Sequence, residues 1–249
     1  MDATWWMFFA VGVIAQAVDG ALGMAFGVTA TTVMLSFGTP PAQASAMVHI
    51  AEMFTTAASG ASHWWHRNVD WTIVRRIAIP GTIGGILGAS VLANVEGKTI
   101  APFVTVYLAL MGLVIVVKAL HQFKLFEPGR RSMPAIGFFG GVLDAIGGGG
   151  WGPIVTSTLI GGGQVPRYVI GSVNLTEFFV TTATSAAFAV SLGLADLAPV
   201  IPLILGGLVT APFAGYLVRI IPAKVLMIAV GSLVLAISVR SLAKLAGLL

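Results

Sequence analysis

Long apolar runs dominate the sequence and leave few ways for the chain to fold. Six of them approach the roughly 20 residues that a helix needs to cross a bilayer, and they lie at 43–62, 73–94, 99–120, 168–192, 196–218 and 222–245. Hydrophobic residues make up 57% of the 249 residues and charged residues only 9%, against about 25% in soluble domains. This balance excludes a soluble enzyme and a disordered chain. The sequence predicts an all-α, polytopic membrane protein with a single membrane domain over residues 1–249.

Two further apolar runs, at 5–37 and 133–161, are too long for one helix and too short for two crossings. Each is interrupted by glycines, within 20–27 and 147–153. Each run therefore predicts a half-helix of about 14 residues, a bend and a second half-helix of about 10, at ~1.5 Å per residue. Neither arm would cross a hydrocarbon core of about 30 Å. A re-entrant hairpin fits, and a kinked, strongly tilted span is the alternative.

A constant offset of 125 residues aligns the two halves of the chain without a gap. It pairs Asp19 with Asp144 and Glu52 with Glu177, and it also pairs bend glycines and residues of the following helix. One register that aligns both the bends and the acids indicates a duplication. We therefore predict eight hydrophobic segments in two four-segment repeats, at about 1–122 and about 130–249.

The distribution of Lys and Arg tests the hairpin hypothesis, because cytoplasmic loops are enriched in these residues. If all eight segments cross the membrane, nine of the 13 Lys and Arg residues lie on one side and four on the other. If the two glycine-broken segments are re-entrant, the division becomes ten against three. The re-entrant arrangement is favoured. Each half then crosses three times, so the halves become inverted repeats with both termini outside.

The glycine bends are candidate anion sites. The first N–H groups of the second arm have no intrahelical partner, and the helix dipole places about +0.5 charge there. Glycine also lets a ligand approach the backbone closely. The alternative is that the glycines serve only tight turning or close packing. The candidate substrate-binding residues at the bends are Gly23, Met24, Gly27, Gly148, Gly149, Gly150, Trp151 and Gly152.

Four acids, Asp19, Glu52, Asp144 and Glu177, lie inside the apolar segments. A carboxylate at the bilayer centre costs about 2.5–3.5 kcal/mol or more, so four at symmetric positions require an explanation. They are interpreted either as neutral or hydrogen-bonded struts that hold the broken backbone, or as proton carriers in coupled transport.

Polar residues recur at helical spacing beside the two glutamates. One face of 43–62 and its extension carries His49, Glu52, Thr56, Ser59 and His63, and one face of 168–192 carries Asn174, Glu177, Thr181 and Thr184. Such faces turn toward protein or a cavity in a membrane. The candidate substrate ligands on them are His49, Thr56, Asn174 and Thr181. His63 and His66 are expected at the wet boundary of the membrane. Glycines at 81–88 and 206–215 are expected to allow close helix packing.

Other functions fit the sequence less well. The absence of cysteine excludes a thiol nucleophile and thiolate metal sites. A cation or metal transporter that uses the buried acids would be opposed by the positive helix ends, and an intramembrane enzyme lacks a nucleophile–base set. The basic residues lie between apolar runs, where they set topology rather than bind nucleic acid. We therefore expect no cofactor, metal or nucleic acid. The expected partners are the bilayer, a small anion and, in coupled transport, protons. The oligomeric state is not indicated.

Two stretches of the second half carry a family resemblance. The sequence GGVLDAIGGGGWGP at 140–153, followed by GSVNLTEFF at 171–179, resembles the TauE/SafE family of sulfite exporters. The two-half organisation extends the resemblance over essentially the whole chain. It implies a transporter of a small sulfur oxyanion, sulfite or a small organosulfonate, in the bacterial inner membrane, whereas composition and spacing indicate only a small anion. Export is expected because an inside-negative potential favours outward movement by about 2.3 kcal/mol per charge per 100 mV. Uptake driven by protons or sodium is the alternative.

Overall fold

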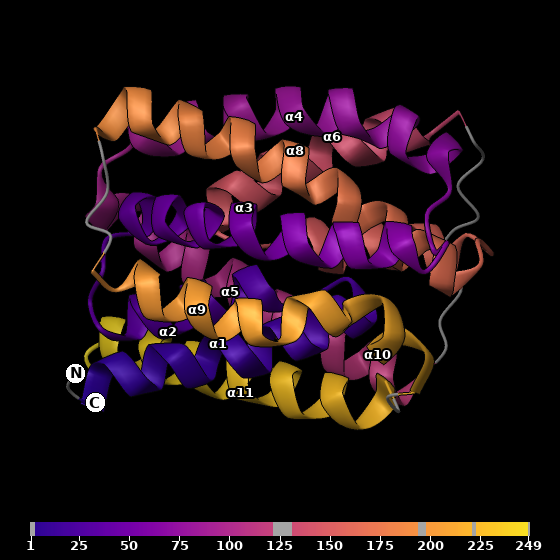
Figure 1. The fold of residues 1–249 in the computed structure, drawn as a ribbon. Helices are drawn as coiled ribbons and strands as arrows, with labels where there is room; N and C mark the ends of the chain where they lie inside the picture. Colours follow the sequence, from indigo (N-terminus) through magenta and orange to yellow (C-terminus); the bar gives the residue numbers. More distant parts are fainter. Residues whose placement is uncertain (1–2, 122–130, 194–197, 221–222, 249) are drawn as a thin grey trace.

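The computed structural model describes residues 3–121, 131–193, 198–220 and 223–248, and these form an all-helical bundle (Figure 1). The first half comprises α1 (Ala3–Leu22), α2 (Phe26–Ser36), α3 (Pro41–Trp65), α4 (Trp71–Ala93) and α5 (Gly97–Leu120). The second half comprises α6 (Met133–Gly147), the π-helix η1 (Gly152–Thr156), α7 (Ser157–Gly161), α8 (Pro166–Leu192), α9 (Val200–Thr210), the 3-10 helix η2 (Ala211–Phe213), α10 (Ala214–Ile220) and α11 (Ala223–Leu245).

Six helical stretches are long and apolar enough to cross a membrane, which confirms the predicted class. They are Ala3–Leu22, Trp71–Ala93, Gly97–Leu120, Pro166–Leu192, Val200–Leu217 and Met227–Leu245. α3 is also long, at 25 residues, but its buried polar face makes it less apolar than these six. Large apolar side chains such as Ile79, Phe103 and Val190 are exposed on the outside of the bundle, as expected for contact with lipid.

The first glycine-broken segment is a hairpin whose first arm is longer than predicted. The ring of Phe37, after α2, lies 6.1 Å from that of Phe8 in α1, so the two helices run antiparallel rather than as one kinked span. α1 has 20 residues, so the expected first arm of about 14 residues is wrong here, and at ~1.5 Å per residue α1 could cross a bilayer. The helix continues through Gly20, which packs against Ala214, and breaks only after Leu22.

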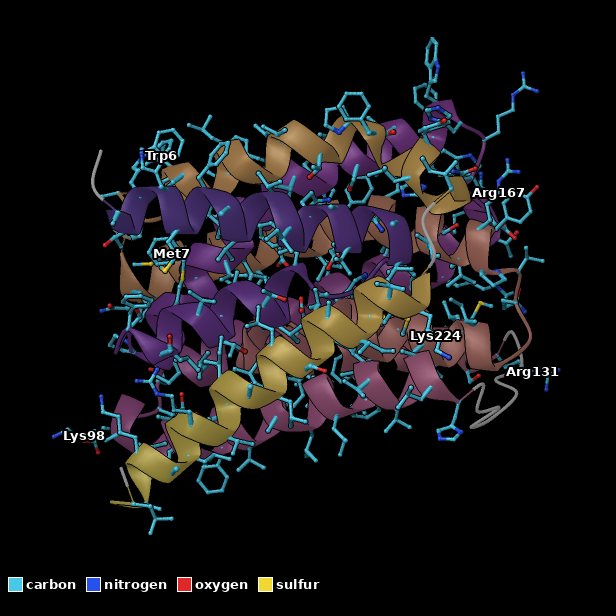
Figure 2. The ribbon with its side chains drawn as sticks, turned by 90° about the horizontal axis from the view of Figure 1, so that it is seen from below. Trp6, Met7, Lys98, Arg131, Arg167 and Lys224 are labelled. Atoms are coloured by element: carbon cyan, nitrogen blue, oxygen red, sulfur yellow. The ribbon has the colours of Figure 1, made fainter. Side chains whose placement is uncertain are left out.

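The second hairpin follows the predicted dimensions. α6 has 15 residues, and η1 and α7 together cover residues 152–161 before the chain turns into α8. Arg131, just before α6, and Arg167, at the start of α8, lie at the same end of the bundle, so the chain enters and returns there (Figure 2). Whether either hairpin remains within a membrane stays a prediction.

The two hairpins enter the bundle from opposite ends. Both chain termini lie at one end (Figure 1), which is also the end of Trp6 and Lys98, whereas Arg131, Arg167 and Lys224 lie at the other (Figure 2). This grouping of basic residues is the one that the ten-against-three division requires. The orientation of the bundle across a membrane remains a prediction.

Helix pairs that cross between the halves hold the bundle together. α4 packs along α6, and their counterparts under the offset of 125, α9 and α1, pack along each other in the same way. α3 packs along α8, and α5 packs along α11. In each of these two pairs the helices are each other's counterparts under the offset. This reciprocal pattern supports the predicted duplication, although the repeat boundaries themselves remain a prediction.

Close packing of these pairs depends on glycine, as expected. A Cβ at Gly88 would lie 2.6 Å from the carbonyl oxygen of Val142 in α6, and one at Gly215 would lie 2.6 Å from that of Ser62 in α3. The fifth predicted span, 196–218, is helical from Val200, but η2 interrupts it at the Ala211-Pro212-Phe213 sequence. Proline has no backbone N–H, so the regular helical ladder is broken at this point.

Candidate functional site

The two glycine bends meet inside the bundle. A Cβ at Gly27 would lie 2.6 Å from the Cα of Gly149, so the two backbones touch. Thr156 donates a hydrogen bond of 2.7 Å to the carbonyl oxygen of Gly23. Its counterpart under the offset of 125, Thr31, donates to the carbonyl oxygen of Gly148. These reciprocal bonds fix the two hairpins against each other.

Asp144 caps the second bend. Gly148 and Gly149 have φ of 67° and 143°, a region that glycine tolerates best, and this turns the chain sharply after α6. The turn brings the backbone N–H groups of Gly150 and Trp151 to Asp144 Oδ1, at 2.8 and 2.9 Å. Asp144 therefore accepts hydrogen bonds from the first amides of the second arm, where an N-cap residue would be expected to act.

The first bend is capped in a related way. Asp19 accepts a hydrogen bond from the backbone N–H of Phe26, the first residue of α2. Glu52, from α3, accepts one from the N–H of Gly27. The amides that the sequence analysis assigned to a substrate anion are thus held, in this conformation, by carboxyl groups of the chain itself. This geometry agrees with the strut interpretation of the acids.

The two polar stripes face each other across the α3–α8 pair and are buried. His49, Ser59, Asn174, Thr181 and Thr184 have an exposed fraction of 0%, and Glu52, Thr56 and Glu177 have at most 3%. Ser59 donates to Asn174 Oδ1 at 2.8 Å and so joins the stripes directly. Thr56 and Thr181 donate instead to the carbonyl oxygens of Glu52 and Glu177 on their own helices. Their hydroxyl protons are therefore already engaged.

His49 links the α3 stripe to the second bend. Its Nε2 lies 3.2 Å from Asp144 Oδ2, and its Nδ1 lies 2.8 Å from the carbonyl oxygen of Ser45. Its ring also packs at 6.0 Å from that of Phe188 in α8. Asn174, the counterpart of His49, makes a similar bond within its own helix, because it donates to the carbonyl oxygen of Ile170, four residues earlier.

His63 is not at a wet boundary, and that expectation is wrong. Its exposed fraction is 0%, and its Nε2 donates to the carbonyl oxygen of Gly20 at 2.9 Å. The reason is that His63 continues the α3 stripe, so the close α3–α10 and α1–α10 packing covers it. Its Nδ1 faces the amide nitrogen of Asn68 at 3.3 Å. His66 is only partly buried.

Several buried oxygens near the bends lack a hydrogen-bond partner among the described residues. They are Asp19 Oδ2, Glu52 Oε2, Glu177 Oε2 and the hydroxyl of Tyr107. The Tyr107 hydroxyl, from α5, lies where a Cβ on Gly150 would be, at the second bend. Unsatisfied buried polar groups are costly, so these atoms mark a place where water or a ligand can bind.

The remaining bend candidates have packing roles. Trp151 is fully buried, and its ring lies against Gly81 of α4 and Gly140 of α6. Met24 lies against Gly152, which has no side chain to separate the hairpins. Sequence reasoning missed Thr31, Thr156 and Tyr107. The offset of 125 could have found the two threonines, but Tyr107 has Ser232 as its counterpart and carried no repeat signal.

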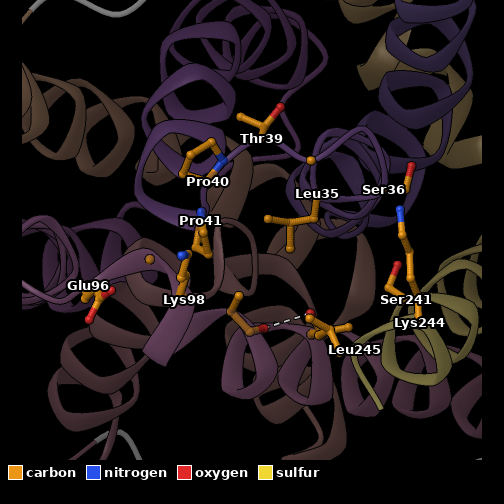
Figure 3. A pocket seen from close by; sticks show the side chains of 14 residues that line it. Leu35, Ser36, Thr39, Pro40, Pro41, Glu96, Lys98, Ser241, Lys244 and Leu245 are labelled. Atoms are coloured by element: carbon orange, nitrogen blue, oxygen red, sulfur yellow. Dashed lines mark hydrogen bonds between the residues drawn. The ribbon is translucent and has the colours of Figure 1, made fainter. Parts of the chain in front are cut away.

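A cavity of about 800 Å³ lies at the end of the bundle that holds the termini. It is lined by the ends of α2 and α11 and the start of α5, and Figure 3 shows Lys98 and Lys244 on different sides of it. None of the candidate site residues lines it. An apolar cluster that includes Val28, Val104 and Leu108 also contains Met24 and Ala25 of the first bend, and Leu35, from the cavity wall, packs against this cluster.

Among the described ranges, no three His, Asp or Glu side chains converge in a way that could hold a metal ion. The four central acids nevertheless interact electrostatically, since Asp19, Glu52 and Asp144 all act on Glu177. The site is therefore a buried, acid-rich polar centre with hydroxyl and amide groups around two touching backbone turns.

Comparison with known proteins identifies the family. The family model for "Sulfite exporter TauE/SafE" matches residues 8–241. The "Probable membrane transporter protein YtnM" of Bacillus subtilis (strain 168) is 39% identical over 245 residues, which cover 95% of this chain and 82% of that protein. No solved structure matches the chain. The predicted resemblance is confirmed, and so is the prediction of a transporter rather than an enzyme. The chain belongs to the TauE/SafE family of multi-pass membrane transporters.

Proposed function

We propose that this transporter exports a small sulfur oxyanion, sulfite or a small organosulfonate, across the bacterial inner membrane. The substrate class follows from the description of the family, "Sulfite exporter TauE/SafE". The anion would bind where the two glycine bends meet. Export is proposed because an inside-negative potential drives net negative charge outward with about 2.3 kcal/mol per charge per 100 mV, so no ion gradient is needed to power it.

The observation that carries the proposal is the contact between the two bends, which come from opposite ends of the bundle. Gly27 and Gly149 touch, and Thr31 and Thr156 join the hairpins reciprocally. A ligand at this contact would sit between two hairpins that each reach one end of the molecule. Broken helices that meet near the middle of the bilayer are a recurrent way to build alternating access.

The ligands for the anion would be backbone amides and hydroxyl groups rather than Lys or Arg. The first amides of η1 and α2 point into the bends, and the Tyr107 hydroxyl lies beside Gly150 with no hydrogen-bond partner among the described residues. Helix N-termini and hydroxyl donors suit oxyanions. In this structure the carboxyl groups of Asp144, Asp19 and Glu52 take these amides. We propose that the substrate oxyanion replaces them during transport.

The cavity at the termini end would be the mouth through which the anion leaves or enters. Lys98 and Lys244 line it together with Glu96, and Arg240 lies about one helical turn before Lys244 in α11. Clustered positive charge raises the local concentration of anions. The apolar cluster around Leu108 would be the closed gate between this mouth and the bends.

A second function, transport of a cation, is favoured by one observation, the unpartnered oxygens of Asp19, Glu52 and Glu177. Sodium or a divalent metal could occupy them, because such ions prefer carboxylate oxygens. The two functions predict opposite ligands for the purified protein.

A ligand screen on the purified protein separates these functions. Sulfite and methanesulfonate should raise the thermal unfolding temperature, because a ligand that binds only the folded state stabilises it by about 2.7 kcal/mol at 100 times its Kd. Chloride at equal ionic strength is the control. Stabilisation by sodium or a divalent metal, with none by sulfur oxyanions, would favour the cation function and overturn our proposal.

A further inference from the structure

The hydrogen bonds of His49 fix which of its ring nitrogens carries a proton. Its Nδ1 lies 2.8 Å from the carbonyl oxygen of Ser45, and a carbonyl can only accept. Nδ1 therefore carries a hydrogen and donates it. The Ser45 hydroxyl, 3.3 Å from Nδ1, donates to the carbonyl oxygen of Ala145 at 2.7 Å and does not change this assignment. In a neutral ring, Nε2 then has only a lone pair to offer.

That lone pair faces Asp144. Nε2 lies 3.2 Å from Oδ2, and the exposed fractions of the two side chains are 0% and 1%. Two acceptor atoms at this distance repel each other unless a proton lies between them. Asp144 Oδ1 already accepts from Gly150 and Trp151, so it cannot relieve the conflict. The pair therefore holds one proton, as imidazolium and carboxylate or as imidazole and carboxylic acid, and its total charge is zero in either form.

His63, in the same helix, shows what a satisfied neutral histidine looks like here. Its Nε2 donates to the carbonyl oxygen of Gly20, and its Nδ1 accepts from the amide of Asn68. The orientation of that amide is fixed, because Arg167 donates to Asn68 Oδ1 at 2.6 Å. His63 therefore needs no additional proton. The extra proton is specific to His49, and its counterpart Asn174 cannot titrate.

The other ionisable groups around the pair are all acidic. Among the described residues they are Asp19 in α1, Glu52 in α3, Glu177 in α8 and Tyr107 in α5. The adjoining α2 and η1 contain no ionisable side chain. No Lys or Arg is therefore available to neutralise an additional negative charge in this part of the bundle, and a proton is the available counter-charge.

We propose that the His49–Asp144 pair is a proton-binding site, and that its loading permits the oxyanion to bind at the second bend, so that each anion binds with one proton. This inference rests on the proposed function. Loading changes the charge of the pair from −1 to zero, which removes repulsion of the anion. When the proton lies on Asp144, loading also weakens the hold of Asp144 on the amides of Gly150 and Trp151, since bonds to a charged acceptor are about twice as strong as neutral ones. A dianion accompanied by one proton keeps one negative charge, so the membrane potential still favours its export.

Counting protons during anion binding tests the proposal. Calorimetric titration of the purified, full-length protein with sulfite, in buffers of different ionisation enthalpy, gives the protons taken up per anion. Sulfite also titrates, but its own contribution cancels when variants are compared at one pH. At a pH high enough for the pair to have lost its proton before sulfite is added, we expect the wild type to take up about one proton more per sulfite than His49→Asn. Its affinity for sulfite should also fall more steeply with rising pH, by up to about tenfold per pH unit. His66→Asn, which alters a partly buried histidine of the same helical segment, should behave as the wild type.

Asp144→Asn provides a matched variant, because its amide can accept at Oδ1 and donate from Nδ2 to His49, as the loaded pair does. We expect it to bind sulfite without the extra proton and with the shallower pH dependence. Equal proton counts in the wild type and in whichever of the two variants folds would overturn the proposal. Absence of sulfite binding by the wild type at every pH would instead overturn the proposed function.

A measurement on the wild type keeps the test decisive if both variants fail to fold. The ring nitrogens of ¹⁵N-histidine-labelled protein report directly where each histidine proton lies. At a fixed pH, sulfite binding should increase the fraction of protein in which the pair holds its proton, because binding of proton and anion must favour each other equally. A His49 signal that saturating sulfite leaves unchanged at every pH would contradict the proposal. His63→Asn, His66→Asn and His121→Asn assign the other three signals.

Discussion

The two glycine bends occupy equivalent positions but hold their backbones differently. At the second bend, one carboxyl oxygen of Asp144 accepts two amides while the other faces His49. At the first bend, Asp19 accepts from Phe26, its Oδ2 has no partner among the described residues, and Glu52 caps Gly27. The second bend is thus a closed network with an ionisable partner, whereas the first divides the same task between two acids.

The backbone shows the same asymmetry. Gly23 and Gly148 have nearly equal φ angles, 65° and 67°, but the following residues differ. The second bend continues with Gly149 at 143°, whereas the first places a non-glycine residue, Ala25, at 116°. A non-glycine residue in such a region costs about 1–3 kcal/mol. The two bends therefore share their geometry where the hairpins touch but differ in the residues that follow the first turn.

Removing the acid at each bend should have the largest effect and should separate the two copies. Asp144→Asn is expected to lower sulfite transport by about tenfold to a hundredfold, because it weakens charge-assisted bonds worth about 1.5–3 kcal/mol and prevents proton release. Asp19→Asn should cost less, since Asp19 caps one amide and has no histidine partner. Sulfite flux in proteoliposomes measures both. Equal loss in the two variants would remove the distinction between the bends.

Bulk at the second bend should abolish anion binding. In Gly150→Val a side chain would occupy the place of the Tyr107 hydroxyl, so either the ring or the bend must move. We expect sulfite to lose its thermal stabilisation of the variant. Gly97→Ala is the control, because a Cβ there would meet only Pro40 and Pro41 at 3.8 Å. Normal sulfite binding by a folded Gly150→Val protein would remove the second bend from the site.

The two glutamates should matter less than Asp144 if they are struts. Glu52→Gln and Glu177→Gln keep the shape of the side chain and can still accept hydrogen bonds. Because such an exchange leaves no polar group unpaired, it should cost little stability, and we expect flux within about threefold of the wild type. Flux is measured with pH and potential set independently. Loss of pH dependence in either variant would move the proton site from His49 and Asp144 to the glutamates. Abolished flux under every gradient would contradict the strut interpretation.

The smallest effect is expected at the cavity. Lys98→Gln together with Lys244→Gln should lower flux from the termini side by no more than about twofold, and only at low salt, because electrostatic attraction there is screened within about 10 Å at 0.1 M salt. Lys224→Gln, at the opposite end (Figure 2), is the control and should leave entry from the termini side unchanged. A salt-independent loss would indicate that the lysines act structurally instead.

Sequence patterns predicted the helices well because helix length and helix faces depend on residues that are close together in the sequence. The length of apolar runs placed α4, α5 and α8 within two or three residues of their observed ends. The 3–4 spacing of polar residues correctly predicted two buried faces, from His49 and from Asn174. The offset of 125 paired Asp19 with Asp144, and each of these acids accepts a hydrogen bond from an amide at the start of the arm that follows its bend. The predicted length of the first arm was wrong because Gly20 resembles a bend glycine in the sequence, whereas in the structure it lies within α1 and packs against Ala214.

What could not be predicted depends on contacts between distant segments. The sequence shows that helix N-termini have free amides, but only the folded chain shows that Asp144 and Glu52 reach them. Likewise His63 fits a membrane boundary by its neighbours, Trp64 and Trp65, yet the packing of α1 and α10 buries it. Partner choice across a bundle is a property of the tertiary fold, so it leaves little signal in a single sequence.

Potential-driven sulfite efflux from proteoliposomes tests most directly whether an oxyanion passes between the two bends. Purified protein is reconstituted with sulfite inside, at equal pH on both sides, and an inside-negative potential is imposed. The wild type should release sulfite faster as the potential becomes more negative, and Gly150→Val should release it no faster than protein-free vesicles. Wild-type vesicles that retain sulfite at every potential, or a folded Gly150→Val protein with wild-type efflux, would contradict the account.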